Sequence, residues 1–174
     1  MANDEPAVGG LPEEPGAPWL HDWYSYDQYR NVHESYMERL AQQGVVLESN
    51  LSFIEVSDHT GLSRVNLTGD IICADGVSVS VEKTLMVLKP ANRRPLVKGR
   101  FYSYHAWLRD EAEGDLIRYD NADGEDDLHR HDFDPRTGAE TARTSIDISE
   151  LPTLGAFIPQ AVELGRRARE LRNE

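Results

Sequence analysis

The chain has 174 residues, enough for one domain with a buried core, and 31 acidic residues against 18 basic ones give it a formal net charge of −13. A charge of that sign repels anionic partners unless a local basic patch receives them. Only three of the basic residues are lysines, and an acidic surface poor in lysine suits a protein that stays soluble in concentrated salt, which screens self-repulsion. We therefore expect a halophilic host, with an acidic mesophilic protein as the alternative.

The single cysteine and the lack of a long apolar segment indicate the compartment. Cys73 cannot form an internal disulfide, and its apolar neighbours predict a buried strand residue in a reducing environment. No apolar segment approaches the roughly 20 residues that a membrane-spanning helix needs, and the N-terminus lacks the core of a signal peptide. We expect a cytoplasmic protein with no membrane contact.

The N-terminal part divides into a tail and a helix. Residues 1–18 contain four prolines and four acidic residues with almost nothing to bury, which predicts a disordered acidic tail ahead of a single domain at 19–174. Apolar residues then recur at intervals of three and four over residues 26–43, as expected for an amphipathic helix that ends at Gly44. His33 lies on the apolar side of this helix, so we interpret it as a packed, hydrogen-bonded histidine rather than a catalytic one.

Three long strands are expected next, at residues 45–56, 63–74 and 77–88. The Asp75-Gly76 pair between the last two is a strong hairpin signal. Residues 89–98 contain two prolines, which a central strand does not tolerate, so we expect a break there.

Shorter strands are predicted at 101–108, 116–120 and 129–133, with an edge strand at 141–148. A C-terminal helix is expected at 153–171, where Pro159 should kink the helix or begin a new one. The whole pattern predicts an α+β fold, an antiparallel β-meander of about five to six strands flanked by an N-terminal and a C-terminal helix.

Histidine, arginine and carboxylate side chains gather between residues 99 and 134. Because side chains alternate across a strand, His129 and His131 must share a face, and we expect His105 and Arg118 to reach that face from the preceding hairpin. Metal-independent ribonucleases use these residue types: one imidazole takes the proton of the 2′-hydroxyl group, another protonates the leaving oxygen, and an arginine stabilises the charge on phosphorus. Asp120 is expected to orient one imidazole, and this chemistry needs no cofactor.

Other uses of these residues stay open. A His-x-His pair aims both imidazoles in one direction, and Asp120, Asp132 or Asp134 could complete a metal site instead. A polar surface face without any ligand fits the same pattern.

A basic cluster precedes this stretch. Arg93, Arg94 and Lys98 are candidate phosphate contacts in an otherwise acidic chain, and Tyr102 is a further candidate for substrate binding. The alternative is a solvated loop with local charge balance.

Three motifs in order carry a family resemblance. Tyr102-Ser-Tyr-His105, then Ile117-Arg-Tyr-Asp-Asn-Ala122, then His129-Arg-His131 resemble the TumE family of prokaryotic toxin–antitoxin toxins. The resemblance implies a toxin encoded beside a cognate antitoxin, a DNA-binding protein of winged-helix type. Family members carry a histidine pair just after the Asp-Asn-Ala segment, where this chain has Asp123-Gly124-Glu125. If that pair takes part in the chemistry, this chain is altered or inactive.

Two functions follow from the sequence. The first is a toxin that acts on RNA through His105, Arg118, His129 and His131. The second is a non-enzymatic binding module, in which the acidic surface and the aromatic sheet engage a partner protein. A short neighbouring gene for a DNA-binding protein would favour the first.

If the acidic surface is an adaptation to salt, the folded state should gain stability as sodium chloride rises toward 1 M, because the Debye length shortens from about 10 Å at 0.1 M to about 3 Å at 1 M. Thermal unfolding followed by circular dichroism measures this effect. A Tm that stays flat or falls over that range contradicts a halophilic adaptation.

Overall fold

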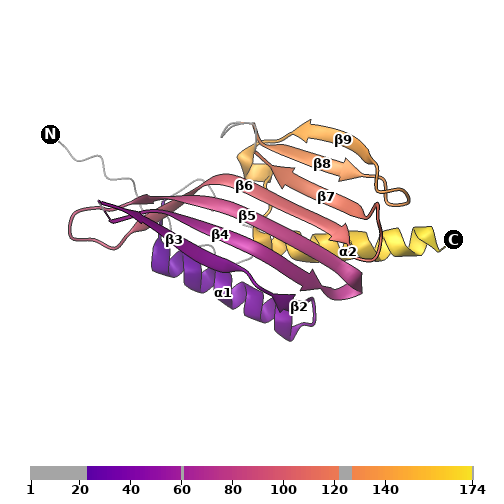
Figure 1. Cartoon of the computed structure of the whole chain (residues 1–174), viewed down its shortest axis with the longest axis horizontal. Coiled ribbons are helices and arrows are strands. Elements are labelled where there is room, and N and C mark those ends of the chain that lie inside the picture. Colours follow the sequence, from indigo (N-terminus) through magenta and orange to yellow (C-terminus); the bar gives the residue numbers. More distant parts are fainter. Residues whose placement is uncertain (1–22, 60, 122–126, 174) are drawn as a thin grey trace.

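The computed structural model describes residues 23–59, 61–121 and 127–173, which form one antiparallel sheet with two helices against one of its faces (Figure 1). This is the α+β fold expected from the sequence. The predicted acidic tail at 1–18 lies outside the described residues.

The sheet is a meander with additions at its ends. The strands are β1 (Tyr24–Ser25), β2 (Val46–Ser49), β3 (Ser52–Asp58), β4 (Gly61–Cys73), β5 (Val77–Leu88), β6 (Leu96–Leu108), β7 (Asp115–Asp120), β8 (His129–Phe133) and β9 (Glu140–Ser145). The helices are α1 (Tyr26–Gln42) and α2 (Leu154–Arg172), with 3₁₀ turns at Ala74–Gly76 and Ile148–Glu150. Strand order is β2-β4-β5-β6-β7-β8-β9, while β3 also pairs with β4 and β1 pairs with β6.

The described residues form nine strands, more than the five or six expected. The expected strand at 45–56 is in fact two strands, because β2 and β3 pair separately with β4. Between β2 and β3, Asn50 Oδ1 accepts a hydrogen bond from the backbone N–H of Asp70 at 2.6 Å, and this contact connects the interruption between the two strands to β4. β1 has only two residues, too few for a periodic signal.

β6 begins five residues earlier than expected. Leu96 and Val97 pair with Leu88 and Val87 of β5, and both are buried. The break predicted from the prolines is therefore shorter, because a strand can start directly after the last of them, Pro95.

Local signals predicted the hairpin between β4 and β5 and the start of α2, but not the effect of Pro159. Asp75 and Gly76 connect β4 to β5 with φ angles of 53° and 67°, the left-handed turn that an Asp-Gly pair favours. Thr153 caps α2 by accepting the N–H of Ala156. Pro159 neither breaks α2 nor begins it, since α2 is one helix from Leu154 onward.

The inner face of the sheet, the face that packs against α1 and α2, forms the core. Val79 and Val81 of β5 lie opposite Ala106 and Tyr104 of β6, and all four are buried. Phe157 of α2 packs on Tyr104 with ring centroids 5.5 Å apart. Each large buried apolar side chain contributes about 1.5–3 kcal/mol, so these contacts hold α2 on the sheet.

α2 approaches the sheet closely at Gly165, where an added Cβ would lie 2.2 Å from Cγ2 of Val77. Val77 is fully buried and stiff about χ1. We expect Gly165→Ala to lower the free energy of unfolding by about 1–3 kcal/mol through overpacking, as measured by chemical denaturation.

The matched background for this test is Val77→Ala, which removes the clashing methyl group. There, Gly165→Ala should be neutral or stabilising, because alanine is the better helix former by about 1 kcal/mol. Equal destabilisation in both backgrounds would show that the close approach is not the cause.

Candidate functional site

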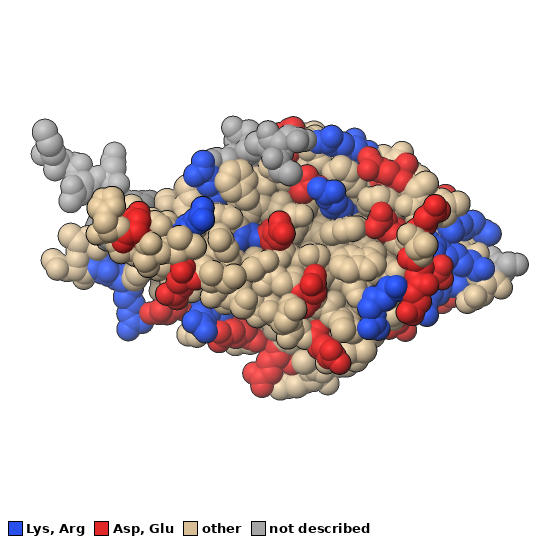
Figure 2. All heavy atoms as spheres, viewed as in Figure 1, with Lys and Arg blue, Asp and Glu red and all other residues tan. Residues whose placement is uncertain are grey.

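The outer face of the sheet, the face turned away from α1 and α2, carries the candidate site. Along β6, His105 points to the outer face, whereas its neighbours Tyr104 and Ala106 are buried on the inner face. Viewed with the sheet in front of the helices, this side shows basic and acidic side chains interspersed rather than gathered into one basic patch (Figure 2).

The strand register aligns the predicted site residues. His105, Arg118, His131 and Arg143 are successive Cα partners across β6, β7, β8 and β9. Strands lie about 4.8 Å apart, so the Cα atoms of the two histidines are about 10 Å apart with Arg118 between them. We call these four residues the outer-face row.

A second row runs beside it. Asp120 and His129 are Cα partners on β7 and β8, two residues along each strand from Arg118 and His131. The side-chain period of a strand is two residues, so these side chains also point to the outer face. All five residues predicted to be catalytic therefore share one face.

Asp120 links the two rows. Its Oδ2 lies 2.6 Å from Nε of Arg118 and 3.2 Å from Nε2 of His131. On its other side, His131 places Nδ1 3.3 Å from Glu140. Asp120 and His131 are only 3% and 8% exposed. Asp120 Oδ2 and His131 Nε2 lie 3.2 Å apart, and neither atom makes a hydrogen bond to any residue that the structure describes.

His105 has a more open environment. Its Nε2 lies 2.8 Å from Oδ1 of Asp115 in a hydrogen bond, and its side chain is about one-third exposed. The ring packs against Trp107 with centroids 5.3 Å apart. A carboxylate accepts hydrogen bonds, so Nε2 carries the ring proton and Nδ1 is the nitrogen left to act as a base.

His129 is held by both ring nitrogens. Nε2 lies 3.1 Å from Asp127, and Nη2 of Arg143 lies 3.3 Å from Nδ1. A guanidinium group only donates, so Nδ1 accepts and the proton lies on Nε2, toward the carboxylate. Both ring nitrogens of His129 therefore have a neighbour, and its ring centroid lies 6.3 Å from that of His131.

Tyr102 does not join the other site residues. It lies on the inner face opposite Lys83 and is buried, and burial raises the pKa of its hydroxyl well above the usual range. The alternation of β6 accounts for this, since a residue three positions before His105 points the other way.

The basic cluster also lies apart from the two rows. Lys98 is seven residues from His105 along β6, on the order of 20 Å. Arg93 and Arg94 lie in the connection from β5 to β6, where Arg94 pairs with Asp27 of α1 at 2.8 Å.

Asp115, Glu140 and Arg143 contact the site histidines but were not predicted. The register shifts by one residue between Ala106 and Trp107, and again at Phe133. Each shift changes which residue of the next strand lies opposite, and periodicity does not reveal it. Of these three residues, only Arg143 could have been placed near the site from the sequence, because it lies in the predicted edge strand.

The metal-site alternative is not supported by the placement of its carboxylates. Asp132 points to the inner face, where it pairs with Arg130 at 2.6 Å. Asp134 accepts the backbone N–H groups of Arg136 and Thr137 in the next turn. Within the described ranges, no three His, Cys, Asp or Glu side chains are arranged to hold a metal ion.

No protein-family model, curated protein or solved structure matches this chain. Neither described helix combines the length and the apolar character needed to cross a membrane. The case for a function therefore depends on the outer face.

The two histidines of the outer-face row should differ in their contribution to stability. His131→Ala should lower the free energy of unfolding by about 1–3 kcal/mol, because it removes a buried ring and leaves the buried Asp120 with Arg118 as its one remaining neighbour in an ion pair among the described residues. His105→Ala removes a partly exposed pair and should cost less than about 1 kcal/mol. Urea denaturation at pH 7 measures both changes, and equal costs would contradict this difference in environment.

Proposed function

We propose that the chain is the toxin component of a toxin–antitoxin system and that it cleaves RNA at the outer-face row. The observation that carries the proposal is the alignment of His105, Arg118 and His131 on three adjacent strands. An arginine between two imidazoles matches what cleavage of a phosphodiester next to a 2′-hydroxyl group requires.

His105 is the base in this proposal. Its Nδ1 takes the proton of the 2′-hydroxyl group while Asp115 holds Nε2. The 2′-oxygen attacks phosphorus and the bond to the 5′-oxygen breaks. The products are a 2′,3′-cyclic phosphate and a 5′-hydroxyl end. The latter forms when Nδ1 of His131 donates a proton to the leaving oxygen after Glu140, whose side chain is 48% exposed, turns away from that nitrogen.

Arg118 binds the phosphate. Its side chain is 42% exposed, so it can turn from Asp120 toward a ligand on the outer face. Asp120 then keeps its contact with His131 at 3.2 Å and orients that imidazole. The phosphate thus replaces a carboxylate as the partner of the guanidinium group.

Net charge is the main obstacle to RNA binding, and salt reduces it. At −13 the chain repels a polyanion at low ionic strength. Near 1 M salt the Debye length is about 3 Å, so only contacts at the site itself act on the substrate. A cytoplasm rich in salt therefore suits this protein and this substrate together.

The partner implied by the resemblance is an antitoxin encoded beside the gene, a DNA-binding protein of winged-helix type. A bound protein that covers the outer face would block access of RNA to the row. The proposal needs no membrane and no cofactor.

A non-enzymatic binding module is the second candidate. Leu47 and Ile54, on β2 and β3, are 58% and 48% exposed and offer apolar surface to a partner. A partner protein could bind them, and the histidines would then be surface residues without a catalytic role.

Inducible expression in a host cell tests the proposal. The parent chain should arrest growth without the neighbouring gene, and cellular RNA should gain 2′,3′-cyclic phosphate ends. His105→Ala and Arg118→Ala should each lower RNA cleavage by about 10²- to 10⁴-fold. His59→Ala, at an exposed turn position after β3, and Arg64→Ala, on β4, are the matched controls and should remain toxic.

Folded His105→Ala and Arg118→Ala variants that remain fully toxic would remove acid–base catalysis from the account. Loss of toxicity in Ile54→Ser, with both site variants active, would instead favour the binding module.

A further inference from the structure

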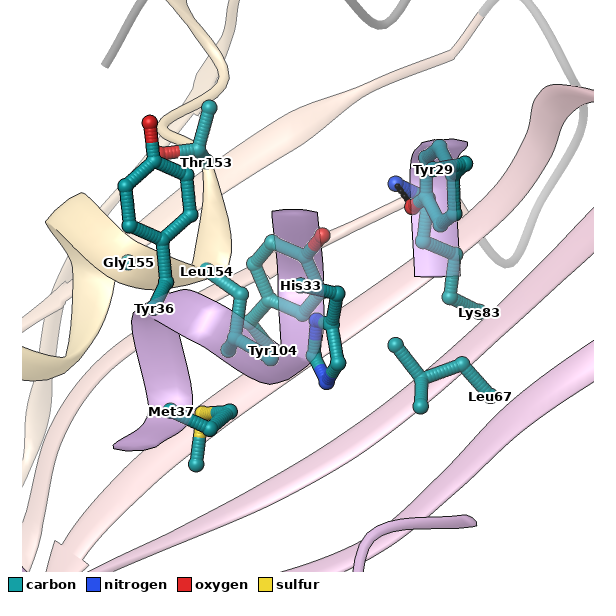
Figure 3. A pocket seen from close by; sticks show the side chains of 10 residues that line it. All are labelled: Tyr29, His33, Tyr36, Met37, Leu67, Lys83, Tyr104, Thr153, Leu154 and Gly155. Carbon is teal, nitrogen blue, oxygen red and sulfur yellow. Dashed lines mark hydrogen bonds between the residues drawn. The ribbon is translucent and has the colours of Figure 1, made fainter. Parts of the chain in front are cut away.

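Two spaces beside α2 differ in what they can hold. The cavity near the N-terminal end of the helix, where α1, α2 and the sheet meet, has a volume of about 20 Å³ (Figure 3). One water molecule needs about 10–15 Å³, so this cavity is too small for a larger ligand. The pocket beside the second half of α2, which we call the α2 pocket, has a volume of about 150 Å³. It lies on the helix side of the sheet, so its role is independent of the outer-face row and of the proposed function.

The α2 pocket is apolar with one charged group. Leu164, Arg167 and Leu171 follow one another at intervals of three and four residues along α2, so they lie on one face of the helix. The facing wall comes from the start of β7 and the end of β8, where Leu116 is 6% exposed and Phe133 is half-buried. The complete lining is Leu116, Phe133, Pro135, Leu164, Arg167 and Leu171, with no Asp or Glu among these described residues.

Two contacts fix the position of α2 relative to the sheet at the two ends of the pocket. At one end, Gly165 lets the helix approach Val77 closely. At the other end, Arg172 donates from Nε to the carbonyl of Pro135 and from Nη2 to the carbonyl of Glu113, both at 2.9 Å. The helix is therefore held at both ends and does not close onto the strands between them. The pocket is preformed, as ligand sites usually are.

Arg167 brings a positive charge to the pocket without a carboxylate of its own. Its neighbour Arg166 pairs with Glu163 at 2.7 Å. Arg169 and Arg172 each have a carboxylate oxygen at 3.4 Å. Among the described residues Arg167 has no carboxylate at ion-pair distance. Its charge acts on Glu163 at longer range, and lowers the pKa of that carboxyl group less than the hydrogen bond from Arg166 does. The exposed guanidinium group can therefore pair with an anion at the pocket.

We propose that the α2 pocket binds a small organic acid that carries one carboxylate on an apolar group about the size of a benzene ring. An apolar cavity of about 150 Å³ is large enough for benzene, so the apolar group fits the volume. Arg167 donates two parallel N–H groups to the carboxylate, a geometry that suits arginine better than lysine. The one charge at the pocket is positive and no lining carboxylate opposes it, so an anion is favoured over a neutral or cationic ligand.

NMR of the leucine methyl groups of the full chain at pH 7 tests the site, with benzoate as the probe and sodium held constant. The signals of Leu164 and Leu171 should shift and saturate, with a Kd on the order of 1 mM for so small a ligand. Benzyl alcohol has the ring without the charge and should bind about threefold to tenfold more weakly. Acetate has the charge without the ring and should not saturate these signals over the same range.

Three variants localise the binding. Arg167→Gln should weaken benzoate binding by about threefold to tenfold and leave benzyl alcohol unchanged. Arg166→Gln is the matched control, because it removes the same charge from the next residue, which does not line the pocket, and it should keep the parental affinity. Leu171→Trp fills the pocket and should abolish saturation by both ring compounds. If Leu171→Trp does not fold, the two arginine variants, both at exposed positions, still decide the question.

Each other outcome overturns the proposal. Leucine signals that do not respond to benzoate show that the pocket takes no such acid. Equal affinities for benzoate and benzyl alcohol mean that the pocket takes neutral apolar groups, such as a side chain of a partner protein. An equal loss in Arg167→Gln and Arg166→Gln means that benzoate follows the general surface charge. Parental affinity in a folded Leu171→Trp variant means that the acid binds elsewhere.

Discussion

The alternation of side chains along β6 is the constraint on which the rest of the structure depends. This strand lies between β5 and β7, and its inner side chains pack under α2. A slip of one residue would expose Tyr104 and drive His105 into the core, since it exchanges the two faces. Burial of Tyr104 against Phe157 therefore also fixes His105 on the outer face. The arrangement of the outer-face row is a consequence of core packing.

A polar region of the inner face lies where α1, α2 and the sheet meet. His33 packs edge-on against Phe53, as the apolar side of its helix predicted. Lys83 also had a signal in the sequence, because it follows Val79 and Val81 at the same two-residue spacing and so belongs to the inner face. An amine in that position opposes the hydrophobic pattern around it, and a local conflict of this kind is expected at functional sites.

Periodicity and turn residues were enough to predict the helices, the hairpin at Asp75-Gly76 and the meander, because each depends on short segments. Departures from the predicted layout come from interactions between segments. The contact of Asn50 with Asp70 divides one expected strand into β2 and β3. The register shift after Ala106 places Asp115 beside His105, and another at Phe133 accompanies the contact of Glu140 with His131. A bulge leaves no trace in a two-residue pattern, so these carboxylates could not be predicted.

The residues of the outer face differ in how strongly the fold restricts their side chains. His105 and Arg118 are partly exposed, and ion pairs of that kind contribute about 0–1 kcal/mol, so backbone position rather than side-chain contact keeps them in place. Asp120 and His131 are buried, so the surrounding packing restricts the movement of both side chains. The side chains of His105 and Arg118 can therefore move to meet a phosphate, while those of Asp120 and His131 stay in place. That combination allows Arg118 to exchange Asp120 for a ligand while His131 stays oriented.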